Sequence, residues 1–172
     1  MLVYLIIIIT AYLLGNISTS YIVAKRLAGV DIRTQGSGNA GSTNVLRTLG
    51  KKAGALTFIG DVLKGLIAVL IARFIAYGAN LDDTTCAYIA VVAVVLGHNY
   101  PVFLGFKGGK GVATSLGSIL GIGLSPVIMM INHNTKGVLV TLFLTISVAI
   151  THKENIKRLL NGTERKLGQK KN

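Results

Sequence analysis

Three long stretches of this chain contain no charged residue, and they restrict the folds open to it. These are residues 1–24, 84–106 and 111–135, none of which holds an Asp, Glu, Lys or Arg. A helix needs roughly 20 apolar residues to cross a hydrocarbon layer about 30 Å thick. Each stretch reaches that length, so the sequence predicts an all-α integral membrane protein that crosses the bilayer several times.

Five membrane spans are expected, at residues 2–24, 53–72, 84–104, 112–131 and 137–151. The last is the shortest, since its length gives only about 22 Å of helix. We expect its flanks, or local thinning of the bilayer, to help it cross. The spans form one small membrane-embedded bundle, a single domain over residues 1–172, with cytoplasmic segments at 25–52, 105–111 and 152–172.

The charges are few and unevenly placed. There are 18 Lys and Arg against 6 Asp and Glu, a net charge of +12. A nucleic-acid-binding domain carries such charge along a polar face, whereas here it lies between long apolar runs, so that class is excluded. With these five spans, 15 of the 18 cations fall on one side of the membrane. Because cytoplasmic loops are rich in Lys and Arg, we expect the N-terminus outside and the C-terminus in the cytoplasm.

Polar residues within the expected spans point to packing or function. Asp61 and Lys64 lie three residues apart on one helical face, and a charge facing lipid is costly. We expect them to pair and fix helix packing; a direct role in an active site is the alternative. The single cysteine, Cys86, excludes an internal disulfide and a cluster of thiolate metal ligands, and we expect it to be a small buried filler.

The first polar segment contains the run GSGNAGSTN at residues 36–44, followed by Arg47. It formally holds a G-x-G-x-x-G pattern, but no buried strand precedes it, so a dinucleotide-binding fold is rejected. Glycines let a backbone approach an anion, the Ser37 hydroxyl is a neutral donor, and Arg47 offers a planar fork for phosphate. A flexible polar linker is the alternative. The candidate substrate-binding residues are Gly38, Asn39, Thr43 and Asn44.

The second polar segment, residues 97–114, ends in a glycine- and lysine-rich run directly before an apolar helix. It lacks the spacing of a Walker A loop. A helix N-terminus has free N–H groups and a positive dipole end, so it attracts anions. The alternative is that the lysines only mark the border of a span. The candidate substrate-binding residues are Lys107, Gly108, Gly109, Lys110, Gly111 and Thr114.

Two histidines have open roles. His98 is expected to be a hydrogen-bonded packing residue, with a base as the alternative. In the C-terminal tail, His152 and Asn155 share a helical face where the last span meets the cytoplasm, so they are placed to close over both glycine-rich loops. The alternative for this tail is an interfacial helix lying on anionic lipid.

These three segments resemble, in order and placement, the three motifs of the bacterial acyl-phosphate:glycerol-3-phosphate acyltransferase family. The matching residues are 37–44 with Arg47, then 97–114, then 152–164. The resemblance implies a bundle of seven helices, short ones included. It also implies transfer of a fatty acyl group from acyl phosphate to glycerol 3-phosphate, giving lysophosphatidic acid and phosphate, the first step of bacterial phospholipid synthesis.

The resemblance also implies roles for individual residues. Its catalytic residues correspond to Ser37, Arg47, His152 and Asn155, and its structural glutamate corresponds to Glu164. The glycerol 3-phosphate site falls on Gly108, Gly109 and Gly111. No metal or organic cofactor is expected, and the active site is expected to face the cytoplasm at the bacterial plasma membrane.

The expected partners are glycerol 3-phosphate, acyl phosphate, membrane lipids and the acyl-phosphate-forming enzyme, with no nucleic acid. Acyl phosphate is an activated mixed anhydride, so the acceptor hydroxyl can attack it directly once both phosphates are held. No covalent nucleophile is required. The proton acceptor is either His152 or the phosphate of the acceptor itself.

Two departures from the family pattern stand out. Ser18 takes the place of a usual proline, and the chain is shorter than the family between Thr114 and His152. The shortening leaves open an inactive homologue that acts as a scaffold. A small membrane transporter component for phosphate or another anion, with Asp61 and Lys64 lining a pathway, is the other alternative.

Overall fold

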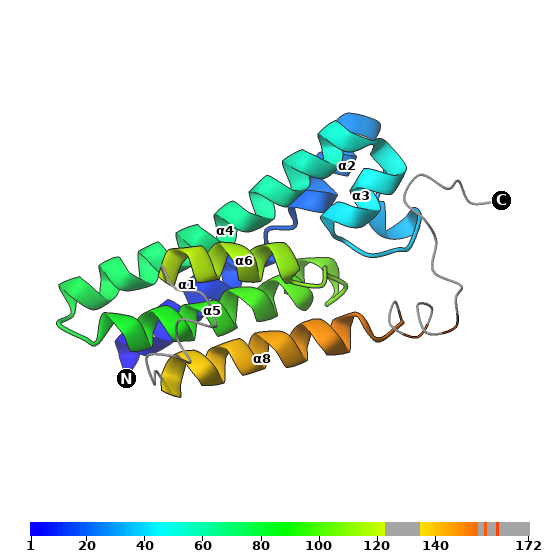
Figure 1. The fold of residues 1–172 in the computed structure, drawn as a ribbon. Coiled ribbons are helices and arrows are strands. Elements are labelled where there is room, and N and C mark those ends of the chain that lie inside the picture. The colour runs from blue at the N-terminus through cyan, green and yellow to red at the C-terminus, as the bar shows by residue number, and fades with distance from the viewer. Residues whose placement is uncertain (123–134, 155–156, 158–160, 162–172) are drawn as a thin grey trace.

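The computed structural model describes residues 1–122, 135–154, 157 and 161. All regular secondary structure in this part of the chain is helical (Figure 1). The elements are α1 (Leu2–Asn16), α2 (Thr19–Ala28), the 3-10 turn η1 (Ile32–Thr34), α3 (Ser42–Leu49), α4 (Lys51–Gly78), α5 (Asp83–Asn99), the 3-10 turn η2 (Val102–Leu104), α6 (Val112–Ile122) and α8 (Thr135–Thr151).

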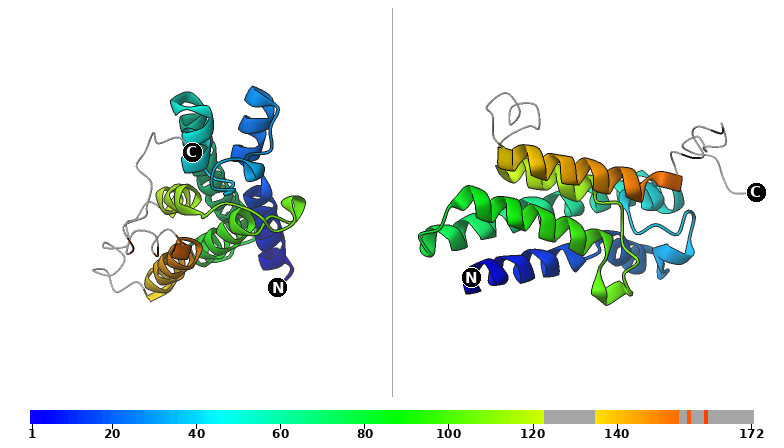
Figure 2. Two further views of the ribbon diagram at one scale, coloured as in Figure 1. Left: turned by 90° about the vertical axis from the view of Figure 1, so that its right-hand side faces the viewer. Right: turned by 90° about the horizontal axis from the view of Figure 1, so that it is seen from below.

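Helix α5 is central to the bundle, since it contacts α1, α4, α6 and α8. The views in Figure 2 show these helices side by side along one axis. Small residues permit the closest crossings. A Cβ at Gly97 of α5 would lie 2.2 Å from the Tyr12 carbonyl oxygen of α1, and one at Gly65 of α4 would lie 2.2 Å from the Thr114 carbonyl oxygen of α6. Helix association in membranes depends on such close backbone approach.

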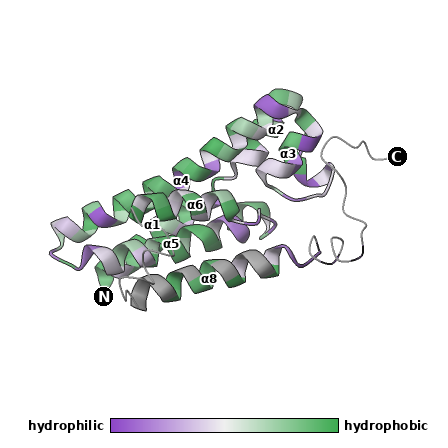
Figure 3. Ribbon diagram, in the orientation of Figure 1, coloured by the Kyte–Doolittle hydropathy of each residue, from purple (hydrophilic) through white to green (hydrophobic). Residues whose placement is uncertain are grey.

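Three helical stretches are long and apolar enough to cross a membrane: Leu2–Ala28, Lys51–Gly78 and Asp83–Leu104. Figure 3 shows hydrophobic residues along α1, α4 and α5. Many large apolar side chains point outward, among them Phe74, which is 79% exposed. A water-soluble protein rarely exposes so much apolar surface, so the all-α membrane class is confirmed.

The shorter expected spans are partly described. Helix α6 covers 112–122, and the rest of the span expected at 112–131 lies outside the described residues. Helix α8 contains the whole stretch expected at 137–151 and begins two residues earlier. Its 17 residues make about 25 Å of helix, still short of a full hydrocarbon layer.

The span expected at residues 2–24 lies within the apolar stretch Leu2–Ala28, but it is not one continuous helix. Helix α1 ends at Asn16 and α2 begins at Thr19, because Ile17 and Ser18 are extended and the Ser18 hydroxyl caps α2 by accepting from the Tyr21 N–H at 3.3 Å. The Asn16 amide supports the break. It donates to the Tyr12 carbonyl oxygen at 2.7 Å and accepts from the Val102 N–H at 2.6 Å.

The segment expected as a cytoplasmic loop, residues 25–52, is a packed unit at one end of the bundle. It holds the end of α2, η1, α3 and the start of α4, and both α2 and α3 pack on α4. Figure 1 shows α2 and α3 together at this end. A small apolar core, separate from that of the bundle, holds the unit: Ala24, Ile32, Ala40, Val45 and Ala53.

Candidate active site

A polar pocket of about 420 Å³ lies where the three predicted polar segments meet. The first segment contributes the largest share of the lining residues. The second segment supplies Gly108, Lys110 and Gly111, and the end of α8 closes a third side. Its lining residues are Ser37, Gly38, Asn39, Gly41, Ser42, Thr43, Asn44, Arg47, Asp61, His98, Gly108, Lys110, Gly111, Val112, Ala113, Thr151, His152 and Glu154.

The Asn44 amide organises the first glycine-rich loop. Its Nδ2 donates to the carbonyl oxygens of Ile32, Gln35 and Asn39 at 3.1, 2.9 and 3.1 Å, and its Oδ1 accepts from the Ser37 N–H at 2.9 Å. Asn44 is only 1% exposed. A buried amide with all these partners fixes the loop backbone, and Ser37 is thereby held at the rim of the pocket. The substrate contact expected for Asn44 stays a prediction.

Two helix N-termini open into the pocket. Helix α3 begins at Ser42 directly after Gly41, and α6 begins at Val112 directly after Gly111. The helix expected after Gly111 is thus confirmed. The first N–H groups of a helix lack intrahelical partners and carry partial positive charge, so such ends attract anions. With Arg47 also lining the pocket, the site is suited to phosphate.

The second glycine-rich loop packs tightly against its surroundings. The Gly109 N–H donates to the His98 carbonyl oxygen at 3.0 Å, and the Gly108 carbonyl oxygen accepts from the Ala40 N–H of the first loop at 3.4 Å. A Cβ at Gly109 would lie 2.1 Å from His98 Nε2 and 2.7 Å from the Ala40 carbonyl oxygen. Only glycine fits here, and the two loops therefore meet backbone to backbone.

A cluster of buried polar side chains lies beneath the pocket. Lys64 Nζ is 2.9 Å from Asp61 Oδ1, with side chains 7% and 3% exposed, so the expected pairing is confirmed. Lys64 also donates to the carbonyl oxygens of Gly15 and Ile17 at 3.3 and 2.9 Å. It thereby satisfies the backbone where α1 ends, in keeping with a packing role. His98 Nδ1 lies 3.6 Å from Asp61 Oδ1.

Asp61 and His98 belong to the buried polar cluster between the helices, and the structure also places both at the wall of the pocket. Both residues line it, although the sequence analysis favoured packing for each. Their presence in otherwise apolar helices was the available signal, because intramembrane ionisable groups are costly to retain without a function.

The end of α8 is fixed against the second loop. The Thr151 hydroxyl donates to the Lys110 carbonyl oxygen at 3.2 Å, and the Ser147 hydroxyl accepts from the Asn99 Nδ2 at 3.0 Å. His152 consequently lines the same pocket as both glycine-rich loops, as the sequence predicted. Two other predicted residues, Asn155 and Glu164, lie outside the described residues.

Three predicted substrate-binding residues do not line this pocket: Lys107, Gly109 and Thr114. Lys107 is exposed, and Gly109 lies behind the His98 ring. Thr114 is fully buried where α6 crosses α4. Thr151 and Glu154 line the pocket without having been predicted; their position beside His152 was the only sequence signal.

The described residues contain no group of three His, Cys, Asp or Glu side chains that could hold a metal ion. The polar atoms at the pocket are donors and cations for the most part. These N–H donors and cations suit an anionic ligand.

The fold and pocket define a class of protein: an all-helical membrane bundle with an anion-suited pocket at one end. The family model described as glycerol-3-phosphate acyltransferase matches residues 5–133. The glycerol-3-phosphate acyltransferase of Clostridioides difficile (strain 630) is 59% identical, over 98% of this chain and 97% of the relative. That of Alkaliphilus metalliredigens (strain QYMF) is 44% identical, over 98% of each. The chain belongs to the glycerol-3-phosphate acyltransferase family.

Solved structures agree with this assignment. The crystal structure of PlsY (YgiH), an integral membrane glycerol 3-phosphate acyltransferase in its glycerol 3-phosphate form, matches with a TM-score of 0.83 and 36% identity over 96% of each chain. Its lysophosphatidic acid form matches with a TM-score of 0.80 and 37% identity.

The alignment with the Clostridioides difficile relative also shows a difference in length. It runs over 198 positions, whereas this chain has 172 residues, so at least 26 aligned positions hold no residue of this chain. Because almost the whole of each protein is aligned, the shortening is internal, as the sequence analysis expected.

Proposed function

We propose that this chain transfers a fatty acyl group from acyl phosphate to glycerol 3-phosphate, forming lysophosphatidic acid and inorganic phosphate. One observation carries the proposal: two glycine-led helix N-termini, α3 and α6, open into a single pocket that Arg47 and Lys110 also line. Such a pocket has donors and charge for phosphorylated substrates. Membership of the glycerol-3-phosphate acyltransferase family indicates that the acyl acceptor is glycerol 3-phosphate.

The reaction needs positioning more than covalent chemistry. A hydroxyl oxygen of glycerol 3-phosphate attacks the carbonyl carbon of acyl phosphate, the bond from that carbon to the phosphate oxygen breaks, and phosphate leaves with its electron pair. Holding both phosphates brings the reacting atoms together. N–H donors and cations at the pocket stabilise the negative charge that develops on the carbonyl oxygen.

Individual residues take the following parts in this proposal. Ser37 and Arg47 act directly at the reacting groups, and Gly108 and Gly111 let the second loop approach the phosphate of glycerol 3-phosphate. The hydroxyl proton passes either to His152 or to the phosphate of glycerol 3-phosphate. Asn155 assists from the C-terminal segment, and Glu164 stabilises that segment.

The proposed setting is the bacterial plasma membrane, with the pocket facing the cytoplasm and the N-terminus outside. The cations near the pocket end, among them Lys51 and Lys52 at the start of α4, support this orientation. Acyl phosphate then arrives from the acyl-phosphate-forming enzyme, and membrane lipids surround the bundle. The transporter interpretation gains no support from the Asp61–Lys64 pair, because these side chains neutralise each other inside the protein.

The test is an assay of membranes containing this chain with acyl phosphate and labelled glycerol 3-phosphate. We expect labelled lysophosphatidic acid, and none when an acyl thioester replaces acyl phosphate. Product no greater than in control membranes contradicts the proposal and favours the inactive scaffold. Movement of phosphate across sealed vesicles without product favours the transporter.

A further inference from the structure

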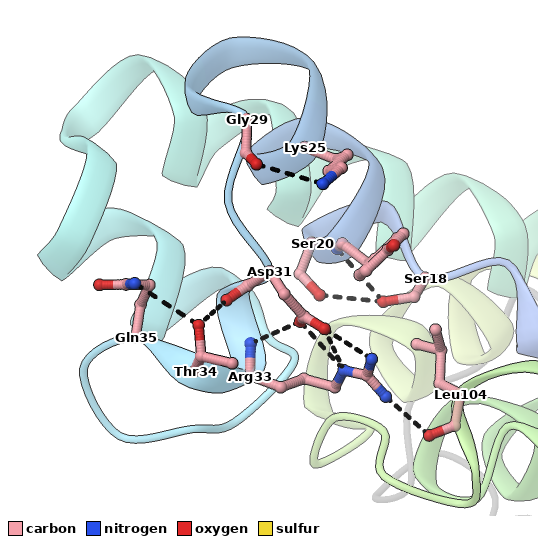
Figure 4. Close-up of polar contacts among 10 residues, drawn as sticks. Ser18, Ser20, Lys25, Gly29, Asp31, Arg33, Thr34, Gln35 and Leu104 are labelled. Atoms are coloured by element: carbon pink, nitrogen blue, oxygen red, sulfur yellow. Dashed lines mark hydrogen bonds and ion pairs between the residues drawn. The ribbon is translucent and has the colours of Figure 1, made fainter.

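The Arg33 side chain connects the two polar segments outside the pocket. Its Nη1 donates to the carbonyl oxygen of Leu104, 71 residues further along the chain, at 2.8 Å. Its Nη2 and Nε donate to the Asp31 carboxylate, at 2.6 Å for the shortest contact. The guanidinium carbon lies 5.6 Å from the centre of the Tyr21 ring. Figure 4 shows Arg33 between Asp31 and Leu104.

Arg33 and Leu104 each lie just before one of the two glycine-rich loops that line the pocket, residues 35–44 and 105–111; these are called the pocket loops. Arg33 lies in η1, four residues before Ser37, and Leu104 ends η2, four residues before Gly108. Between these loops the structure gives one direct backbone hydrogen bond, from the Ala40 N–H to the Gly108 carbonyl oxygen, and it is long at 3.4 Å. The Arg33 side chain adds a second link, between the segments that lead into the two loops.

Arginine suits this task better than lysine. Its planar guanidinium directs separate N–H donors to Asp31 and to Leu104 at once, whereas an ammonium is a single point charge. Asp31 also caps η1 by accepting from the Arg33 N–H at 2.9 Å. The hydrogen bonds from Arg33 hold the pKa of the Asp31 carboxyl below its ordinary value of 3.8, so the carboxylate is charged at neutral pH.

The Asp31–Arg33 ion pair is partly exposed, with side chains 28% and 25% accessible. Pairs at this exposure add little to global stability. The geometric effect of the contact is consequently separable from any effect on folding.

We propose that Arg33 is a positioning residue of the acyltransferase, which holds the two pocket loops at the spacing that lets one phosphorylated substrate contact both. This inference rests on the proposed function for its kinetic consequence. Its structural consequence, restricted motion of the two loops, does not depend on activity.

The kinetic test compares Arg33→Ala and Arg33→Lys with the unsubstituted chain. We expect Arg33→Ala to raise the KM for glycerol 3-phosphate about tenfold, the size of losing one hydrogen bond to a charged group. Arg33→Lys is expected to raise it nearly as much, and kcat is expected to fall less than KM rises. The control is Arg26→Ala, an exposed cation on α2, which is expected to leave both constants unchanged.

A double variant tests whether Asp31 and Arg33 act as one unit. Asp31→Ala is expected to raise the same KM, and the double variant is expected to be no worse than Arg33→Ala alone, because coupled residues are not additive. If the effects of Asp31→Ala and Arg33→Ala on KM are fully additive, the two residues do not act together. An unchanged KM in both Arg33 variants overturns the proposal. A lowered melting temperature with an unchanged KM in the folded fraction also overturns it.

Hydrogen exchange provides the test that is independent of catalysis. In detergent without substrate, peptides covering residues 35–44 and 105–111 are expected to exchange faster in Arg33→Ala, and at the unsubstituted rate in Arg26→Ala. Equal exchange in all three proteins overturns the proposal even if the chain makes no product. Absence of product from the unsubstituted chain, in contrast, contradicts the proposed function alone.

Discussion

The bundle has an ion pair at each end, and the two pairs differ in how far they are buried. At the pocket end, Asp61 and Lys64 are paired inside the protein, with side chains no more than 7% exposed. At the opposite end, Arg73 and Asp83 form a pair 2.8 Å apart whose side chains are 44% and 43% exposed. Their contacts also differ, since Lys64 reaches carbonyls at the α1–α2 break whereas Arg73 reaches the Gly121 carbonyl oxygen at the end of α6.

The two pairs differ in what it costs to form them. An exposed pair costs little to form and adds little. A buried pair costs several kcal/mol of desolvation per ion, and apolar residues of the same volume often stabilise as well or better. Lys64 serves the packing at the α1–α2 break, whereas Asp61 also lines the pocket, so the Asp61 carboxylate has a place at the site as well as in the packing.

The largest expected effect is on activity at the pocket end. Arg47→Ala removes the guanidinium that lines the pocket, and Ser37→Ala removes the neighbouring hydroxyl. We expect each to lower product formation by about 10²–10³-fold, the range for losing one group that stabilises a developing oxyanion. The assay is labelled glycerol 3-phosphate in membranes, with the amount of protein measured by immunoblot.

The matched control for Arg47 is Lys52→Ala, which removes an exposed cation at the start of α4. It is expected to keep activity close to that of the unsubstituted chain. If Arg47→Ala and Lys52→Ala lower product formation equally, Arg47 has no specific role at the site and contributes only positive charge.

The next largest effect is on stability. Asp61→Asn leaves Lys64 charged and buried without its carboxylate, and we expect it to lower the free energy of unfolding by about 3–5 kcal/mol. The double variant Asp61→Asn with Lys64→Met is expected to recover part of this loss: no unpaired charge remains, but the Gly15 and Ile17 carbonyl oxygens lose their donor. Thermal unfolding in detergent measures both. If Asp61→Asn lowers the free energy of unfolding no more than a substitution at the exposed Arg73–Asp83 pair does, the buried and exposed pairs do not differ in energetic importance.

A smaller effect on substrate binding is expected from Gly108→Ala. The new Cβ would lie 2.0 Å from the His98 carbonyl oxygen and 2.7 Å from the Asn99 carbonyl oxygen, so the loop must shift. We expect the KM for glycerol 3-phosphate to rise by about 10- to 100-fold, since small misplacements at a site are costly. Gly78→Ala at the opposite end is the control, because a Cβ there meets nothing within 4 Å. An unchanged KM in Gly108→Ala contradicts the assignment of this loop to phosphate.

The smallest effect belongs to the exposed pair. Arg73→Ala is expected to lower the free energy of unfolding by about 0.2–1 kcal/mol, the range for exposed ion pairs. Product formation is expected to stay unchanged, because Arg73 is remote from the pocket in the bundle. A larger loss of activity than of stability in this variant indicates that the opposite end also takes part in function.

Much of the candidate site was predictable because its signals are local. Gly41 and Gly111 each stand directly before a helix, and the run of donors between Ser37 and Asn44 is continuous in the sequence. Long apolar stretches predict membrane helices by length alone. The break at Ile17 and Ser18 was not predicted, although residues 15–20 read GNISTS, because no charged residue interrupts the stretch there. Part of its support comes from Lys64, 47 residues beyond Ile17.

The sequence by itself determined the membrane class, the three polar segments and the order in which they occur, since each depends on neighbouring residues. Only the tertiary structure decided that Asp61 and His98 reach the pocket from two different helices and that Arg33 meets the Leu104 carbonyl. These contacts join residues far apart in the chain. They exist because α4 and α5 cross closely and because η1 and η2 emerge at the same end of the bundle, and neither arrangement is encoded in any local pattern.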